Sequence, residues 1–316
     1  MKRHPLLLHE AARDRRLVCD GAMGTQLMAA GLEAGGCGER WNLDHPDRVL
    51  AIQRRYVAAG ADCLITNTFG GSRTMLTRHG HGGEVDALNA AGVRIAREAF
   101  TREGREGWVL GDVGPLGAIL EPWGDLPVDV ARAAYEEQCA ALVGAGADGI
   151  IVETETSLEA LGLAIDAARA AGAPSVVACL SYDLSADRSF YVTMMGVRPE
   201  AAAVFMAERG AHVAGLNCGT GVDMAGVAAV VRAYRAHCGL PTLGQPNAGN
   251  PVLEHGRAVY RQTPAEMAAG VPEVLAAGAD IVGSCCGSTP EHTAAIRQAV
   301  DAFTAARARE TARTVR

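Results

Sequence analysis

Within Ala277-Gly278-Ala279-Asp280-Ile281-Val282-Gly283-Ser284-Cys285-Cys286-Gly287, a helix end, an apolar strand and two neighbouring cysteines follow one another. Glycine is typical of a helix that ends in a left-handed residue, after which the chain enters the next element. The same phrase stands at Ala59-Gly60-Ala61-Asp62 and at Ala145-Gly146-Ala147-Asp148. Variants of it are Ala171-Gly172-Ala173-Pro174 and Arg209-Gly210-Ala211-His212. This repeated signal predicts that helices and strands alternate along the chain.

Short, nearly continuous apolar runs are typical of parallel strands that are buried on both faces. We expect eight such strands, at Leu17–Asp20, Asp62–Asn67, Trp108–Val113, Gly149–Thr154, Ser175–Ser181, Val213–Asn217, Pro241–Gln245 and Ile281–Ser284. Helical stretches are expected between them, at Pro46–Ala59, Val85–Phe100, Val128–Gly144, Leu158–Ala171, Pro199–Glu208, Val222–His237 and Pro264–Ala277. The alternation predicts an α/β fold, a (β/α)8 TIM-type barrel, and a doubly wound open sheet is the alternative.

The length and composition of the chain are consistent with one large barrel domain. The sequence has 316 residues, of which 49% are hydrophobic, and no low-complexity linker divides it. Length alone suggests about two domains, but α/β barrels often run this long as one. We therefore expect a single domain over residues 1–316, with its core at about residues 10–300.

The net charge and the cysteine content indicate which classes of partner and which cellular compartment are expected for the protein. The net charge is −7, and no Lys/Arg cluster precedes the C-terminal tail, which argues against nucleic acid or an anionic membrane as partner. No stretch approaches the roughly 20 apolar residues of a membrane span. The three-leucine run near the N-terminus is too short for a signal peptide. Nine cysteines without such a signal fit a reducing compartment, so we expect a cytoplasmic protein.

Polar residues stand at the C-terminal end of every predicted strand, where the active site of a (β/α)8 barrel lies. Stability alone does not explain all eight ends, although a single residue such as Asp112 is equally well interpreted as a helix cap or loop residue. The strand ends are Asp20-Gly21-Ala22-Met23-Gly24-Thr25, Thr66-Asn67-Thr68-Phe69, Asp112-Val113-Gly114-Pro115, Glu153-Thr154, Ser181-Tyr182, Asn217-Cys218-Gly219, Pro246-Asn247-Ala248-Gly249 and Cys285-Cys286-Gly287.

Three cysteines are expected to meet over the barrel mouth. Cys218 ends the sixth strand and Cys285-Cys286 end the eighth, with one strand between them. Three thiolates and one open position suit catalytic zinc. Adjacent cysteines make a poor disulfide, because their Cα atoms are only about 3.8 Å apart. On spacing alone, zinc and a purely structural role are evenly balanced, since cysteine is often a small buried hydrophobe. We expect that structural role for Cys19, Cys37, Cys63, Cys139, Cys179 and Cys238.

The strand-end motifs resemble the homocysteine S-methyltransferase family over about residues 10–300. The resemblance is closest to the homocysteine-binding module of cobalamin-dependent methionine synthase. The sequence is also similar to betaine–homocysteine and S-methylmethionine–homocysteine methyltransferases. The matching motifs are Asp20-Gly21-Ala22-Met23-Gly24-Thr25, Trp41-Asn42-Leu43, Thr66-Asn67-Thr68-Phe69-Gly70, Gly111-Asp112-Val113-Gly114-Pro115, Val152-Glu153-Thr154, Gly215-Leu216-Asn217-Cys218-Gly219, Pro246-Asn247-Ala248-Gly249 and Gly283-Ser284-Cys285-Cys286-Gly287-Ser288-Thr289-Pro290-Glu291-His292.

The resemblance implies a methyltransferase that makes methionine from homocysteine, with one zinc ion per chain held by Cys218, Cys285 and Cys286. It implies that Asp20 and Glu153 place the substrate, and carboxylates match its ammonium group. The substrate carboxylate suits the backbone N–H groups of the loop that follows the first strand. Residues expected to contact homocysteine are Asp20, Gly21, Met23, Gly24, Thr25, Asn67, Asp112, Glu153, Ser181, Asn217 and Asn247.

One of these residues carries a further hypothesis. The amide oxygen of Asn247, which follows the seventh strand, is expected to occupy the open position on zinc until the substrate thiolate displaces it. An ordinary turn asparagine beside Gly249 is an equally good interpretation.

The sequence leaves the methyl donor open between S-methylmethionine, S-adenosylmethionine, another small molecule and a methylcorrinoid on a separate protein. Thr154 stands where the betaine enzymes have Tyr, and an aromatic content of 4% offers little for a quaternary-ammonium cage. Ser284 and Ser288 replace the Gly and Thr of the methionine synthase pattern, and both are small enough to keep zinc binding. Two alternatives remain: another acceptor thiol or selenol, or a zinc barrel that is one component of a multi-protein corrinoid methyl-transfer system.

Overall fold

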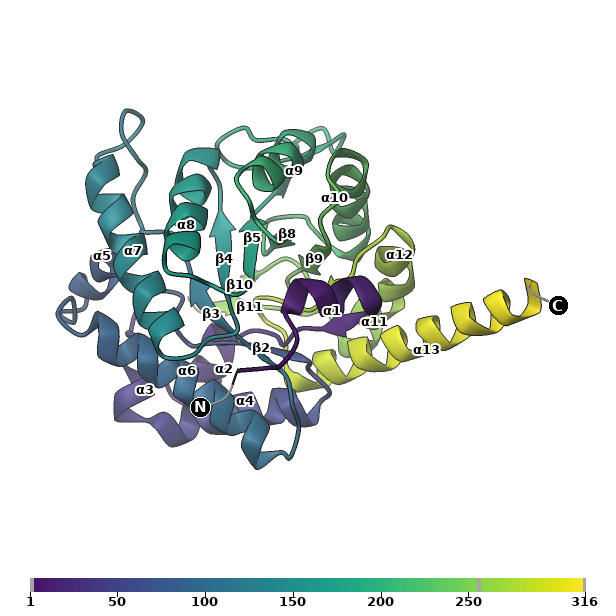
Figure 1. The fold of residues 1–316 in the computed structure, drawn as a ribbon, viewed down its shortest axis with the longest axis horizontal. Coiled ribbons are helices and arrows are strands. Elements are labelled where there is room, and N and C mark those ends of the chain that lie inside the picture. Colours follow the sequence, from purple (N-terminus) through teal and green to yellow (C-terminus); the bar gives the residue numbers. More distant parts are fainter. Residues whose placement is uncertain (1–2, 255–256, 315–316) are drawn as a thin grey trace.

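Eight parallel strands form a barrel that is surrounded by helices (Figure 1). The computed structural model describes residues 3–254 and 257–314, and the strand order in it is β1-β12-β9-β8-β5-β4-β3-β2. A parallel bridge between Cys19 and Cys63 joins the two ends of this order. The predicted barrel is therefore confirmed, and the open sheet is excluded. The strands are β1 (Leu17–Val18), β2 (Cys63–Ile65), β3 (Trp108–Val113), β4 (Gly149–Glu155), β5 (Val176–Leu180), β8 (Val213–Asn217), β9 (Thr242–Gln245) and β12 (Ile281–Val282).

The helices of the described chain are α1 (Leu8–Asp14), α2 (Gly24–Ala29), α3 (Trp41–Asp44), α4 (Pro46–Ala58), α5 (Arg73–Thr77), α6 (Val85–Arg102), α7 (Val128–Gly144), α8 (Leu158–Ala170), α9 (Pro199–Glu208), α10 (Met224–His237), α11 (Pro264–Ala269), α12 (Val271–Ala276) and α13 (Pro290–Thr314). Helix α13 extends well beyond the barrel (Figure 1). Among the described residues, no helix combines the length and the apolar character needed to cross a membrane.

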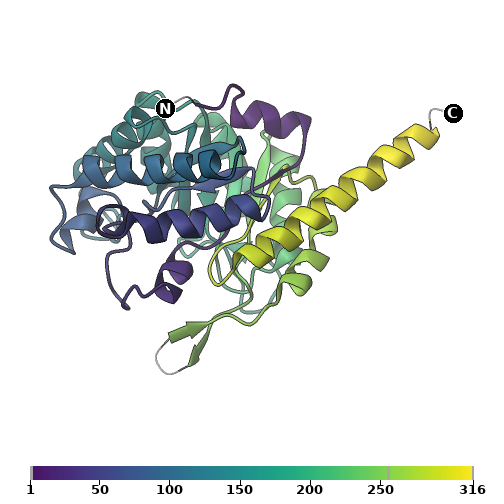
Figure 2. The ribbon, with the colours of Figure 1, turned by 90° about the horizontal axis from the view of Figure 1, so that it is seen from below.

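Two hairpins that the sequence analysis did not predict stand on loops of the barrel. Strands β6 (Asp183–Leu184) and β7 (Tyr191–Val192) pair after β5, and β10 (Val252–Glu254) pairs with β11 (Arg257–Val259) after β9. Figure 2 shows the β10–β11 hairpin projecting from the body of the protein. Both hairpins follow barrel strands at their C-terminal ends, so they add to the rim where the site was expected.

Several predicted boundaries differ from the structure. The helix expected at Pro264–Ala277 is two helices, α11 and α12, that meet at Gly270. Pro272 explains the break, because it lacks an N–H group and clashes with the preceding turn of a continuous helix. The eighth strand ends at Val282 and not at Ser284, although the Ser284 N–H still donates to the Asp20 carbonyl at 3.2 Å. After Val282 the chain is no longer part of the strand, but it is still hydrogen-bonded to the segment that follows β1.

The aspartates of the repeated Gly-Ala-Asp phrase fix neighbouring strands to one another. The Asp62 carboxylate accepts from Val18 N at 2.9 Å, and the Asp62 N–H donates to the Val18 carbonyl at 2.7 Å. Asp148 makes the same pair of bonds with Val109, and Asp280 makes it with Thr242. In the variant phrase, His212 takes this role on Val176 through its backbone N–H and Nδ1. Each clamp sets the register of one strand pair at the start of the strands.

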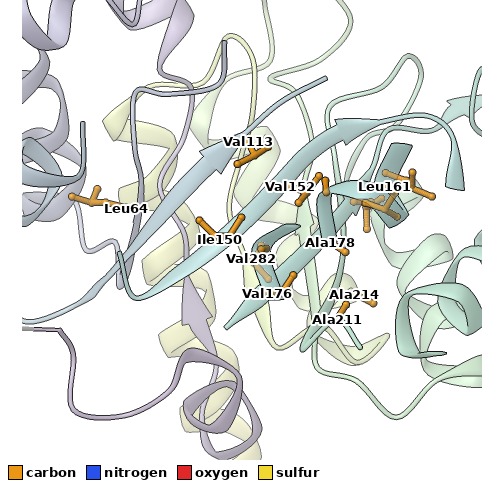
Figure 3. Close-up of a cluster of buried hydrophobic side chains, with 14 of the residues drawn as sticks. Leu64, Val113, Ile150, Val152, Leu161, Val176, Ala178, Ala211, Ala214 and Val282 are labelled. Carbon is orange, nitrogen blue, oxygen red and sulfur yellow. The ribbon is translucent and has the colours of Figure 1, made fainter. Parts of the chain in front are cut away.

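Two large apolar clusters fill the fold, one inside the barrel and one around it, and a small third cluster joins Leu76, Val85 and Leu88. The inner cluster joins strand residues such as Leu17 and Val213 to Leu8 of α1, so α1 closes the N-terminal end of the barrel. The outer cluster packs small strand residues such as Ala178 and Ala214 against the helices (Figure 3). The core therefore uses alanine and branched aliphatic side chains where larger aromatic ones would not fit.

The six cysteines outside the predicted metal site behave in two ways. Cys19, Cys63 and Cys179 fill the barrel interior, and Cys139 is on the buried face of α7, so the structural interpretation is confirmed for these four. Cys37 and Cys238 are only partly buried, but each packs against an apolar cluster, so the structural interpretation holds for them in part. They lie outside the buried strands, Cys37 in a loop and Cys238 at the C-terminal cap of α10, where the fold does not enclose them.

The clamp at Asp148 predicts a large loss of stability when its carboxylate is removed. Asp148→Ala deletes the bond to Val109 and leaves the buried Arg97 guanidinium without its ion-pair partner. We expect the free energy of unfolding to fall by about 3 kcal/mol. Urea unfolding should show no comparable loss for Asp86→Ala, an exposed carboxylate in the first turn of α6. Equal losses for the two variants would contradict the clamp.

Candidate active site at the barrel mouth

Three thiols converge where β8 and β12 end. The Sγ atoms of Cys218, Cys285 and Cys286 all lie within 4.8 Å of one another. Cys218 follows β8, the cysteine pair follows β12, and β9 lies between the two strands. Sulfurs bound to one zinc at about 2.3 Å are roughly 3.8 Å apart in tetrahedral geometry. The cluster therefore has the spacing of a three-sulfur metal site.

The backbone around the cysteines adopts conformations that bring the thiols together. Cys218 has a left-handed φ of 60°, which is uncommon for a residue with a side chain. Gly219 follows with a φ of 89°, and a Cβ atom there would meet the Tyr182 carbonyl at 1.9 Å. Gly287 has a φ of 78°, and a Cβ atom there would lie 2.0 Å from the ring of Tyr260. Only glycine fits at these two positions, because both the backbone and the space exclude a side chain.

Hydrogen bonds make the three sulfurs unequal. The thiols of Cys285 and Cys286 lower the pKa of Cys218, because they donate hydrogen bonds to its sulfur. The same contacts raise the pKa of Cys285 well above its usual value and that of Cys286 to about 11. Tyr260 also hydrogen-bonds to Cys286. These contacts favour the thiolate form of Cys218, which suits the binding of a positive ion.

Three buried carboxyl groups lie near the C-terminal ends of three strands. Asp20 follows β1, Asp112 is the penultimate residue of β3, and Glu153 is two residues before the end of β4. Strands β3 and β4 are neighbours, and β2 lies between β1 and β3. Burial raises the pKa of Glu153 to about 7, while a hydrogen bond with Asp112 lowers it and the charge of Cys218 raises it. Burial also raises the pKa of Asp112 and of Asp20, and the charge of Glu153 adds to both. The three groups are therefore close enough to repel one another.

These carboxyl groups have no internal cation to compensate them. Among residues 3–254 and 257–314, no Lys or Arg forms an ion pair with Asp20, Asp112 or Glu153. Asp20 is fixed by the Ile65 N–H at 2.8 Å, whereas Asp112 Oδ1 is buried without a hydrogen-bond partner in the described chain. Buried charges are normally paired, so this arrangement fits a cation that comes from outside the protein.

Asn217 connects the thiols to the end of β4. Its Oδ1 accepts from Thr154 N at 2.8 Å, and its Nδ2 donates to Thr154 Oγ1 at 2.8 Å. The same Nδ2 lies 3.8 Å from Cys285 Sγ. Thr154 has a φ of 60°, next to a register shift in the pairing of β4 with β5. Asn217 therefore holds a strained residue in place beside the sulfur cluster.

Asn247 lies against the loop that contains Cys218. Its Nδ2 donates to the Gly219 carbonyl at 3.0 Å, and its side chain also hydrogen-bonds to the sulfur of Cys218. Its Oδ1 is buried and has no partner among the described residues. The oxygen is free to bind a metal, and its place on zinc remains a prediction.

Two predicted residues have bonds that point to structural roles. Asn67 donates from Nδ2 to the Gly38 carbonyl and to Asn42 Oδ1, so it holds α3, which contains Trp41-Asn42-Leu43, and the residue Gly38 before it. The Ser181 N–H donates to the Glu155 carbonyl at 2.8 Å and continues the β4–β5 pairing. Substrate contacts of these two residues remain predictions.

The Gly21–Thr25 loop is tied to the cysteine loop by Ser288. Its Oγ donates to the Cys285 carbonyl at 2.8 Å and accepts from Ala22 N at 3.0 Å. A Cβ atom on Gly21 would lie 2.5 Å from the same Oγ, so the two loops are in close contact. The Ala22 N–H is thereby occupied, which leaves Met23, Gly24 and Thr25 as the predicted carboxylate donors.

Sequence reasoning did not assign roles to Thr154, Glu155 or Tyr260. Glu155 stands two residues after Glu153, and its carboxyl group is buried and accepts from Tyr135 OH at 2.6 Å. Residues two apart in a regular strand face the same side, but the register shift between Val152 and Glu155 interrupts this alternation, so alternation offered no signal for Glu155. Tyr260 gave no such signal, because only the β10–β11 hairpin brings it to Cys286.

Comparisons with known proteins agree with this geometry. The family model for homocysteine S-methyltransferase matches residues 17–300. Methionine synthase from Mycobacterium leprae is 34% identical over 305 residues, which are 93% of this chain and 25% of that protein, and the Mycobacterium tuberculosis protein gives the same values. The chain thus spans a quarter of the length of these curated relatives.

A solved structure shares the fold. The metallated form of the Escherichia coli homocysteine methyltransferase MmuM matches with a TM-score of 0.75 at 22% identity, covering 92% of this chain and 99% of that one. The family model and the mycobacterial relatives cover nearly all of the present sequence. The chain therefore belongs to the homocysteine S-methyltransferase family.

Proposed function

We propose that the protein transfers a methyl group to the sulfur of homocysteine and releases methionine. One observation carries this proposal: a three-thiol cluster stands beside three buried carboxyl groups that have no cation in the described chain. Homocysteine matches both halves, because it has a thiol for the cluster and an ammonium group for the carboxylates. Membership of the family supports the same substrate.

We assign zinc to Cys218, Cys285 and Cys286, as one ion per chain. Three thiols within 4.8 Å suit zinc, and a three-ligand site leaves one position for a substrate. Bound zinc would supply acidity, since a coordinated thiol loses its proton at neutral pH. The unpartnered Oδ1 of Asn247 supports its role as a fourth ligand in the absence of substrate.

The protein's own groups would orient the substrate. Glu153 and Asp20 receive its ammonium group, and the arrival of that cation favours their ionised forms over the protonated ones that burial promotes. The free backbone N–H groups of residues 23–25 receive its carboxylate. The substrate is then held at both charged ends, and its sulfur is directed to the cysteine cluster.

The chemical step is a displacement at a methyl carbon. The homocysteine sulfur, whose proton has gone to solvent, forms a bond to the methyl carbon of the donor. The bond between that carbon and the donor atom breaks, and its electron pair stays on the donor. A sulfonium donor carries one positive charge and leaves as a neutral thioether. The thiolate carries one negative charge and becomes the neutral thioether of methionine, so the charges balance.

A donor screen tests the proposed function. Protein supplemented with zinc is incubated with homocysteine and, in turn, S-methylmethionine, S-adenosylmethionine, glycine betaine and a methylcorrinoid protein, and methionine is measured by mass. We expect methionine with at least one donor. Methionine only with the corrinoid protein would favour the alternative, a barrel that serves as one component of a multi-protein system. Methylation of other thiols but not of homocysteine would contradict the proposal.

Zinc binding is testable without activity. We expect one zinc per chain in protein purified under reducing conditions and supplemented with zinc. Cys285→Ala should lose tight binding and keep the barrel folded, whereas Cys238→Ala, at a partly exposed cysteine on the cap of α10, should keep the ion. Metal analysis with circular dichroism measures both. A ratio far below one would count against the assignment.

Glu153→Gln should weaken homocysteine binding and leave zinc content unchanged. A charged hydrogen bond is worth roughly 1.5–3 kcal/mol, so we expect the dissociation constant to rise about 10-fold or more. Glu136→Gln, on the exposed side of α7, is the matched control. A thiol without an amino group should bind wild type and Glu153→Gln equally. Loss of zinc in Glu153→Gln would show that Glu153 does not act through the ammonium group.

A further inference from the structure

Two carboxyl groups, those of Asp112 and Glu153, meet inside the barrel mouth. Leu110 belongs to the inner apolar cluster, so Asp112, two residues later in the regular strand β3, faces the same interior. Glu153 reaches it from the neighbouring strand β4, and the two side chains hydrogen-bond to each other. The residues are 5% and 8% exposed, so water contributes little to the solvation of either carboxyl group.

This contact fixes the number of protons that the pair holds. An ionised carboxylate has only acceptor atoms, so a hydrogen bond between two carboxyl groups requires a proton on one of them. Two buried carboxylates in contact would also repel each other, and such pairs retain one proton that they share. The pair therefore carries a single negative charge, and the surroundings of the two residues decide which of them holds the proton.

The surroundings of Asp112 favour its neutral form. Its Oδ1 is buried without a hydrogen-bond partner among the described residues, whereas a carboxylate would need donors there. Burial raises its pKa, and the charges of Glu153, Glu39 and Asp20 raise it further. Cys179 of β5 is a further titratable neighbour, and burial raises the pKa of that thiol as well. Within residues 3–254 and 257–314, no Lys or Arg forms an ion pair with Asp112.

Glu153 is the member of the pair that ionises more readily. Burial raises its pKa to about 7, the hydrogen bond with Asp112 opposes that rise, and the charge of Cys218 adds to it. A substrate ammonium group brings one positive charge, which the carboxylates of Glu153 and Asp20 already exceed. A third ionised group at Asp112 would remain uncompensated, so the proton stays on Asp112 when the substrate binds.

We propose that Asp112 keeps its proton at neutral pH and donates a hydrogen bond from it to the carboxylate of Glu153. Asp112 is then a positioning residue, because it holds the Glu153 carboxylate in one orientation for the ammonium group of homocysteine. This role differs from direct binding of the ammonium group by an ionised Asp112. The location of the proton follows from the fold, whereas the positioning role rests on the proposed function.

Infrared difference spectroscopy tests the location of the proton without any substrate. At neutral pH, the spectrum of wild type minus that of Asp112→Asn should contain the carbonyl stretch of a protonated carboxyl group. Asp86→Asn, which removes an exposed carboxylate in the first turn of α6, is the matched control and should yield only carboxylate bands. Carboxylate bands without the acid band for Asp112→Asn would overturn the proposal.

The pH dependence of stability is a second measurement that needs no substrate. In the unfolded chain an aspartate ionises at about pH 4, so a protonated Asp112 means that folding takes up a proton above that pH. Its contribution to stability is complete below about pH 4 and is lost as the pH rises. From about pH 5 to about pH 7, the folding constant of wild type relative to Asp112→Asn should fall about 10-fold per pH unit. Urea unfolding measures this ratio, and a ratio that does not change with pH, as expected for Asp86→Asn, would contradict the proposal.

Calorimetric binding of homocysteine to zinc-supplemented protein tests the positioning role. Asp112→Val removes the donor to Glu153 and should weaken binding about 10-fold. Asp112→Asn supplies an amide N–H in its place and should restore most of that loss. Equal weakening in the two variants would show that Asp112 acts through a charge, which overturns the positioning role. Absence of homocysteine binding in wild type would instead refute the proposed function, and the infrared and stability measurements would still decide the location of the proton.

Discussion

Strand register at the closed end of the barrel is the constraint on which the candidate site depends. Asp62, Asp148 and Asp280 each exchange two bonds with a neighbouring strand, and His212 does the same. Side chains alternate along a strand, so a slip of one residue would turn every inward group outward. The cysteines and carboxyl groups at the far end of the barrel are therefore positioned by bonds made at the near end.

The electrostatic character of the barrel mouth comes from acidic groups that no Lys or Arg of the described chain neutralises. The thiol of Cys218 and the carboxyl groups of Asp20, Asp112 and Glu153 lie close together at the mouth. In the described chain, surface carboxylates are paired with arginines many times, as in Arg73 with Glu137, yet none of these four groups is. Burial raises the pKa of the three carboxyl groups, so the folded protein favours their protonated forms. An ammonium group placed among them would favour the ionised forms instead.

The sequence predicted the parts of this structure that have a period or a repeated phrase. Eight apolar runs and the Ala-Gly-Ala-Asp signals were enough for the barrel, because buried parallel strands and helix ends have local signatures. The helix break at Pro272 was missed although proline is itself a local signal for a break. The early end of β12 was missed because a strand end depends on pairing with neighbouring strands. The same limit applied to the site: strand ends located Cys218 and Glu153, but Tyr260 reaches Cys286 only through a hairpin, and Thr154 is a site residue because of its left-handed backbone.

The fixed orientation of the Asn217 side chain affects how strongly the neighbouring sulfurs would donate electrons to a metal ion. Its amide cannot rotate by half a turn, because that would set its N–H groups against the N–H of Thr154. Cys285 therefore always meets a hydrogen-bond donor, while Cys286 meets a phenol and Cys218 meets the side chain of Asn247. Partners outside the ligand shell tune the basicity of the ligands they touch. Three chemically identical residues thereby have three different hydrogen-bond partners, and they would differ in the strength with which they donate electrons to a bound ion.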